Sequence, residues 1–148
     1  MEVMAPEQLE VMEVAAVNNY QQHHTELLME RKFSSDCKSL CKHFVDFCKD
    51  HLQIDDRVKV QFLSERDGEM TTGCYIPSSR QIKILVKDRG LVDVLRSLAH
   101  ELVHQKQHLD GSLENMSGET GSPHENEANA KAGIIMRLYQ DKHKNKIY

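Results

Sequence analysis

Two histidines and one glutamate stand at a spacing that suits metal chemistry. The stretch LRSLAHELVHQKQHLDG, residues 95–111, places His100 and His104 one helical turn apart, with Glu101 directly after the first histidine. An α-helix turns by about 100° per residue, so both imidazoles project from the same face and can reach one ion. Zinc, which binds imidazole nitrogen at roughly 2.0–2.1 Å, is the ion that we expect here.

The position of Glu101 indicates a hydrolytic role. Its side chain points about 100° away from that of His100, which brings it near the ion without binding it. Zinc lowers the pKa of its bound water towards ~7, so a nearby carboxylate can take a proton from that water and pass it to a leaving amine. We therefore interpret Glu101 as the general base of an enzyme that hydrolyses amide bonds.

The motif gains its weight from its context. In a chain of 148 residues with nine histidines, an H-E-x-x-H pattern arises by chance in roughly one case in twenty, so the pattern alone does not decide the function. The residues before it carry a helical apolar stripe, which Leu102 and Val103 continue on the core side. The plainer alternative is a surface helix with histidines on its solvated face, and the stripe argues against it.

The residues around the motif predict an α+β fold. Helical spacing of apolar residues predicts four helices. Alternating apolar residues in RVKVQFLSE and GCYIPSSRQIKILV predict three antiparallel strands, the last two joined as a hairpin by Pro-Ser-Ser-Arg. We expect one domain over residues 1–148, with a helical N-terminal part (1–55) and a catalytic core (57–140). The predicted helices run from Pro6 to about Arg31, from Ser34 or Ser35 to Leu52, from Leu91 to near Asp110, and from Pro123 onward.

Two stretches together, RSLAHELVHQKQ and ENEANAKAG, resemble the zincin metallopeptidases, and specifically the small gluzincins with IrrE/ImmA-type domains, whose later helix carries E-x-E-A-N-x-x-A. The resemblance covers roughly residues 57–140. It implies a minimal zincin fold with a small antiparallel-edged sheet, an active-site helix and a C-terminal glutamate helix. It also implies that the strand over about Gln81 to Val86 lines the substrate cleft and pairs with an extended peptide. The first 55 residues lie outside it, and we expect N-terminal helices that pack on this core or cap the cleft.

A catalytic zinc takes three protein ligands and keeps one open position, so one more residue must complete the site. Asp110 lies where the metzincin pattern places a ligand, but Gln107 replaces the glycine with which that pattern turns the chain back. Ser122 is the predicted N-cap of the last helix, and Glu125 is its expected capping-box partner. His124 sits in the first helical turn.

These considerations favour Glu127 as the third ligand. Glu127 shares a helix face with Ala130, Ile134 and Leu138, a stripe that should face the core. An acid on a core face needs a partner, and zinc would be that partner. We therefore predict His100, His104 and Glu127 as the metal ligands. The candidates that stay open for the third ligand are His124, Glu125, His108 and Asp110.

The sequence predicts a zinc metallopeptidase with Zn²⁺ as cofactor and a peptide or protein as substrate. One alternative is a zinc-binding regulatory or protein-interaction module with little turnover, although a purely structural site would need no Glu101 and would be closed by four ligands. Another is an SprT/Spartan-like protease acting on DNA-bound proteins, whose third ligand is histidine. Two weaker candidates are Tyr75, as a donor to an oxyanion or as a packed strand residue, and His108, near the ion or at a hydrophilic helix end.

Composition excludes some partners. The formal net charge of -4 and the charged fraction of 28% give no basic face for nucleic acid. The N-terminal stretch MEVMAPEQLEVMEVAAV is acidic, and no apolar run approaches the roughly 20 residues that span a bilayer. We expect a cytoplasmic protein without a membrane partner, in the host cytoplasm if a bacteriophage encodes it. Three cysteines share one helical stripe and suit packing: Cys37, Cys41 and Cys48.

Overall fold

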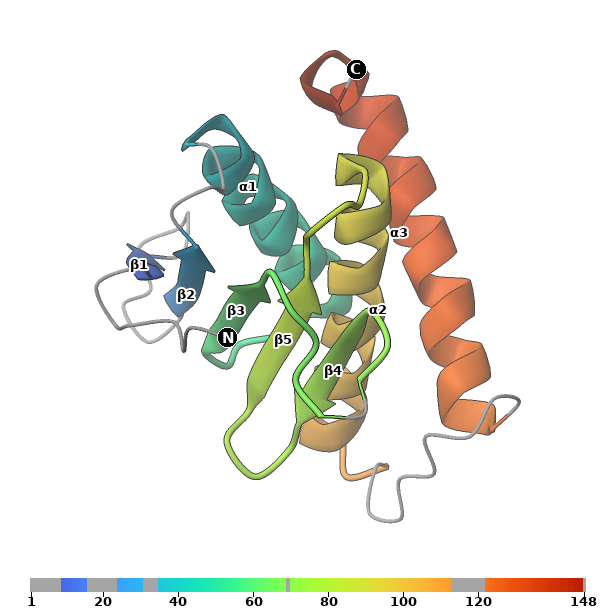
Figure 1. Ribbon diagram of the computed structural model, residues 1–148. Coiled ribbons are helices and arrows are strands. Elements are labelled where there is room, and N and C mark those ends of the chain that lie inside the picture. The colour runs from blue at the N-terminus through green and yellow to red at the C-terminus, as the bar shows by residue number, and fades with distance from the viewer. Residues whose placement is uncertain (1–8, 16–23, 31–34, 69, 113–121, 148) are drawn as a thin grey trace.

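The computed structural model describes residues 9–15, 24–30, 35–68, 70–112 and 122–147. These residues form one five-stranded sheet and three helices (Figure 1), so the predicted α+β class is confirmed. None of the described helices is long and apolar enough to cross a membrane. The elements in chain order are β1 (Leu9–Ala15), β2 (His24–Glu30), α1 (Ser35–Leu52), β3 (Val58–Leu63), β4 (Gly73–Ile76), β5 (Gln81–Leu85), α2 (Leu91–Leu109) and α3 (Pro123–Ile147).

The strands lie in the order β1-β2-β3-β5-β4. The predicted hairpin is present as β4 and β5, which pair antiparallel around the Pro77–Arg80 turn. The prediction that β3 is antiparallel as well is wrong, because β4 lies beyond β5 and leaves β3 and β5 as parallel neighbours. The same strand order contradicts the prediction that the strand over about Gln81 to Val86 pairs with an extended peptide. Both edges of β5 are occupied, by β3 and β4, whereas the outer edge of β4 pairs with no other strand among the described residues.

The expected helix from Pro6 to Arg31 is wrong for the part that the structure describes. Residues 9–15 form β1 and residues 24–30 form β2, which pair antiparallel, and β2 adds to β3 as a parallel neighbour. A short apolar run fits a strand as well as a helix, and an available sheet edge then decides between them. In the first 55 residues the described helix is therefore α1 alone. Pro6, Arg31 and Ser34 lie outside the described residues.

Helix α2 occupies the centre of the molecule. Figure 1 shows α2 between the strands β4 and β5 and the long helix α3, and α1 packs on α2 and α3 as well. Alternate side chains of β3 and β5 point into the core, as their burial patterns show. The core contains large side chains of α2 and of the elements around it. These buried residues include Leu95, Leu98, Leu102, Phe44, Phe62, Ile82, Ile84 and Tyr139.

Helix α2 ends where the sequence predicts. Gly111 adopts a positive φ of 79°, which a residue with a side chain rarely adopts. Its N–H donates to the carbonyl of His108, and the N–H of Ser112 donates to the carbonyl of Gln107, each over 3.0 Å. This pair of bonds satisfies the carbonyls of Gln107 and His108 and fixes the end of the helix that carries them.

Gly73 lies where the edge strand β4 approaches both β5 and Glu101 of α2. A Cβ at this position would lie 2.9 Å from Ile84 Cδ1, 3.1 Å from the Lys83 carbonyl and 3.5 Å from Glu101 Cγ. The 2.9 Å contact is with the end of a flexible side chain, which can turn away, whereas the 3.1 Å contact is with backbone, which would have to move by a few tenths of an ångström. The absence of a side chain at Gly73 therefore lets β4 lie close to β5, whereas the 3.5 Å to Glu101 is an ordinary van der Waals contact.

We expect Gly73→Ala to lower the free energy of unfolding by about 1–3 kcal/mol, because the added methyl overpacks the space between β4 and β5. Gly133→Ala is the matched control, since a Cβ there meets no atom within 4 Å and alanine favours a helix. Urea denaturation of both variants measures the difference. Equal stability of Gly73→Ala and the parent would contradict the close approach.

Candidate metal centre

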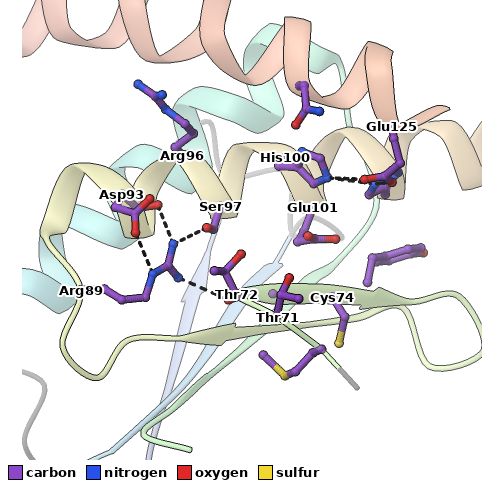
Figure 2. Close-up of a pocket in the computed structure, with 15 residues that line it drawn as sticks. Thr71, Thr72, Cys74, Arg89, Asp93, Arg96, Ser97, His100, Glu101 and Glu125 are labelled. Atoms are coloured by element: carbon purple, nitrogen blue, oxygen red, sulfur yellow. Dashed lines mark hydrogen bonds and ion pairs between the residues drawn. The ribbon is translucent and has the colours of Figure 1, made fainter. Parts of the chain in front are cut away.

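Three side chains from two helices converge on one point. His100 and His104 project from α2, and Glu125 comes from the first turn of α3. The two Nε2 atoms lie 3.2 Å apart, and Glu125 places Oε1 3.1 Å from Nε2 of His100 and Oε2 2.6 Å from Nε2 of His104. All three ligand atoms lie within 4.8 Å of one another. His100, Glu101 and Glu125 are labelled in Figure 2. The cluster can bind a metal ion.

Glu125 reaches the cluster because Ser122 is the N-cap residue of α3, which places Glu125 in the first turn of that helix. The Oγ of Ser122 accepts a hydrogen bond of 3.2 Å from the N–H of Glu125, so half of the predicted capping box is present. The carboxylate of Glu125 points instead toward the two imidazoles. Ala128 and Ala132, which are buried, allow α3 to lie close to α2. The assumption that capping occupies the Glu125 side chain is therefore wrong.

Glu127 does not belong to the cluster. Its Oε1 accepts a hydrogen bond of 2.7 Å from Nε2 of Gln107, and its Oε2 lies 3.5 Å from Nζ of Lys131. Its side chain is 45% exposed. The structure thus brings Glu125, not the predicted Glu127, to the two histidines.

The reason is that α3 buries a different face from the one predicted from the sequence. Ile134 and Leu138, which the prediction placed toward the core with Glu127, are 54% and 42% exposed. The buried residues follow another helical stripe, and Glu125 stands one turn before it on the same face. Reading that stripe first would have favoured Glu125 from the sequence. Its members are Ala128, Ala132, Ile135, Met136 and Tyr139.

Two imidazoles and a carboxylate are donors of the kind that bind zinc. Two nitrogens bound at 2.0–2.1 Å in tetrahedral geometry stand about 3.3 Å apart, close to the 3.2 Å between the two Nε2 atoms. Nδ1 of His104 lies 2.8 Å from Oε1 of Gln107, an acceptor that holds the ring proton on Nδ1 and leaves Nε2 free to ligate. Burial and the neighbouring His104 lower the pKa of His100, which favours its neutral, metal-binding form.

Glu101 lies beside the cluster without joining it. It is 7% exposed and, as Figure 2 shows, its carboxylate points from α2 toward the strand that carries Cys74. Burial, followed by the negative charge of Glu125, raises the pKa of Glu101 to about 8. Glu101 and the three donors line the same pocket.

A pocket of about 520 Å³ opens against these residues. Its walls are the segment from Met70 to Tyr75 and the exposed side of α2, with Glu125 and Asn129 from α3. Figure 2 shows Arg89 at the far side of the pocket from Glu125. The Arg89 guanidinium is fixed there by Asp93, at 2.9 Å, and by the Oγ of Ser97, at 2.6 Å.

Tyr75 and His108, the two weaker candidates, lie together. The Tyr75 hydroxyl and Nδ1 of His108 are 2.6 Å apart, and Tyr75 lines the pocket. Burial raises the pKa of Tyr75 to about 12, so the hydroxyl keeps its proton at neutral pH. The pair therefore places a protonated hydroxyl at the pocket wall.

Two further candidates for the third ligand, His124 and Asp110, do not reach the donors. Nε2 of His124 faces the carbonyl of Ser112. Asp110 caps the C-terminal end of α2, and its carboxylate lies 3.5 Å from Nζ of Lys106. Both side chains therefore stand outside the cluster.

The interpretation of this cluster rests on its own geometry. Comparison of the chain with protein-family models, with curated proteins and with solved structures gives no match. Within the described residues, no second group of three histidine, cysteine or acidic side chains gathers its ligand atoms in this way. The cluster is therefore the part of the structure from which a function can be argued.

We expect zinc to stabilise the protein and Glu125→Ala to remove the effect, because the ion would join α2 to α3. Free zinc at 100 times its Kd adds about 2.7 kcal/mol, or roughly 5–10 °C in Tm for a chain of this size. Asp110→Ala is the control, since that acid is exposed and outside the cluster. Thermal melting with zinc and with a chelator checks it. Equal zinc stabilisation of Glu125→Ala and the parent would contradict the ligand assignment.

Proposed function

We propose that the protein is a zinc-dependent metallopeptidase in which His100, His104 and Glu125 hold the metal and Glu101 is the general base. The observation that carries the proposal is the convergence of three zinc-type donors beside a buried carboxylate, at the wall of an open pocket. Hydrolytic zinc sites combine three protein ligands with one position left for water or substrate. A pocket against the donors supports that open position.

The residues divide the chemistry among them. When bound, zinc supplies a Lewis acid that polarises a carbonyl and makes a water molecule more acidic. An Oε atom of Glu101 takes the proton of the attacking water and then returns it to the nitrogen of the leaving amine. Without a cation the raised pKa of about 8 keeps Glu101 mostly protonated at neutral pH, so its role as a base depends on bound zinc, whose positive charge would lower that pKa.

The substrate would lie along β4. This strand ends the sheet order, and its residues Gly73, Cys74 and Tyr75 line the pocket. An exposed strand edge binds an extended peptide through main-chain hydrogen bonds, which favours peptides over compact small molecules. Such binding would carry the scissile bond past Glu101, whose side chain faces this strand. With Nδ1–H of His108 donating to the phenol oxygen, the Tyr75 hydroxyl, still protonated at neutral pH, would be free to donate a hydrogen bond to the carbonyl oxygen as negative charge develops.

We expect Glu101→Gln to lower kcat for an unstructured protein such as casein by at least about 100-fold, because it removes the base. Zinc content and thermal stability should match those of the parent, since Glu101 is not a ligand. Casein digestion and metal analysis of both proteins test this. Zinc binding in the parent without turnover of casein or other unstructured proteins would instead favour the regulatory zinc-binding module. Full activity of Glu101→Gln would show that Glu101 is not the base.

We expect Tyr75→Phe to lower kcat by about tenfold or more with little change in KM, because the hydroxyl contacts the substrate oxygen only as charge develops on it. Zinc affinity should stay unchanged. Tyr139→Phe is the control, since its hydroxyl binds Nδ1 of His43 at 2.7 Å, away from the pocket. Peptide hydrolysis measured over a range of substrate concentrations separates the two constants. A change in KM alone would assign Tyr75 to substrate binding.

A further inference from the structure

The amide of Gln107 is held at both of its ends. Gln107 is 3% exposed and lies in the last turn of α2, one turn after His104. Its Oε1 lies 2.8 Å from Nδ1 of His104. Its Nε2 donates to Oε1 of Glu127 over 2.7 Å and to the carbonyl of His124 over 3.1 Å. Each polar atom of this buried amide therefore has a partner on a different residue.

These partners permit only one orientation of the amide. A carboxylate and a carbonyl accept hydrogen bonds and cannot donate them, so the NH₂ group must face Glu127 and His124. The amide oxygen then faces Nδ1 of His104, which must carry the ring proton in order to donate to it. With the proton on Nδ1, the lone pair of Nε2 points at His100 and Glu125.

We propose that Glu127 is a positioning residue for the metal centre, acting through Gln107 to hold His104 in the form that ligates through Nε2. The proposal rests on the proposed function, because it assumes that the cluster binds zinc. In the opposite orientation the NH₂ group would face Nδ1, the ring proton would move to Nε2, and that nitrogen could not ligate. Turning the amide would also bring its oxygen against the Glu127 carboxylate and the His124 carbonyl, three acceptors without a donor.

Neighbouring charges keep Glu127 in place for this role. Lys131, one helical turn later, lies 3.5 Å from Oε2 of Glu127 and leaves Oε1 for Gln107. Ser122 and Glu125 fix the start of α3, so Glu127 reaches Gln107 from the same helical turn that delivers Glu125 to the metal. One turn of α3 thus supplies a ligand and also orients a ligand of α2.

The test compares the effect of Glu127→Gln in two backgrounds, the parent and the Gln107→Glu variant. Glu127→Gln should lower zinc affinity about tenfold, because an amide at position 127 also permits the wrong orientation of Gln107. In a Gln107→Glu background the same change should raise zinc affinity, because the amide at position 127 donates to the carboxylate at position 107 and removes a like charge beside it. A general effect of charge predicts lower affinity in both backgrounds, since each substitution removes one negative charge near the cation. The sign therefore distinguishes the relay from simple electrostatics.

Zinc affinity is measured by competition with a chelator, and Asp110→Asn, which removes an exposed carboxylate outside the relay, should stay within about twofold of the parent. A second readout is the imidazole resonances of zinc-loaded protein labelled with ¹⁵N-histidine, in which His104 of the parent shows a hydrogen-bonded Nδ1 proton that Gln107→Leu loses. An effect of the same sign in both backgrounds, or no such proton in the parent, overturns the relay. Failure of the parent to bind zinc overturns the proposed function and the relay with it.

Discussion

Two carboxylates, Glu101 and Glu125, face one small volume between α2, α3 and β4, and this like charge in a buried place is the constraint on which the site depends. Isolated charge is unfavourable away from water, and two acids close together oppose each other's ionisation. The pKa of Glu101, raised by burial and by Glu125, records that conflict. A divalent cation held by Glu125 and two neutral imidazoles would resolve it. The repulsion between the two acids is therefore offset while a cation is bound and returns when the cation is removed.

The local parts of this site could be predicted from the sequence. The spacing of His100 and His104 on an apolar helix, the Ser122 cap and the β4–β5 hairpin each follow from short-range pattern, and each is present. What failed required knowledge of tertiary contacts. The helix expected over 6–31 became β1 and β2 where it is described, since the edge of β3 offered a partner.

The third member of the cluster was missed for a related reason. The sequence marks Glu125 as a capping residue, but capping needs only its backbone N–H, so its carboxylate stays free for the histidines. Glu127 was favoured because its neighbours Ile134 and Leu138 are apolar, yet those residues are exposed. An apolar side chain is weak evidence for a buried face, whereas a stripe of small residues against a neighbouring helix is stronger. Gln107, which stands where the metzincin pattern has the glycine that turns the chain back, instead binds His104.

The position of Glu125 on α3 has a consequence for how the molecule matures. Its partner His100 stands 25 residues earlier in the chain, and the two meet only when α3 lies against α2. A chain that has formed the sheet and α2 holds both imidazoles and Glu101, but it has two donors for the metal instead of three. The complete set of three donors thus forms only with α3, the last of the described helices along the chain. If the proposed function holds, the protein would therefore stay inactive towards other polypeptides until α3 has packed on α2.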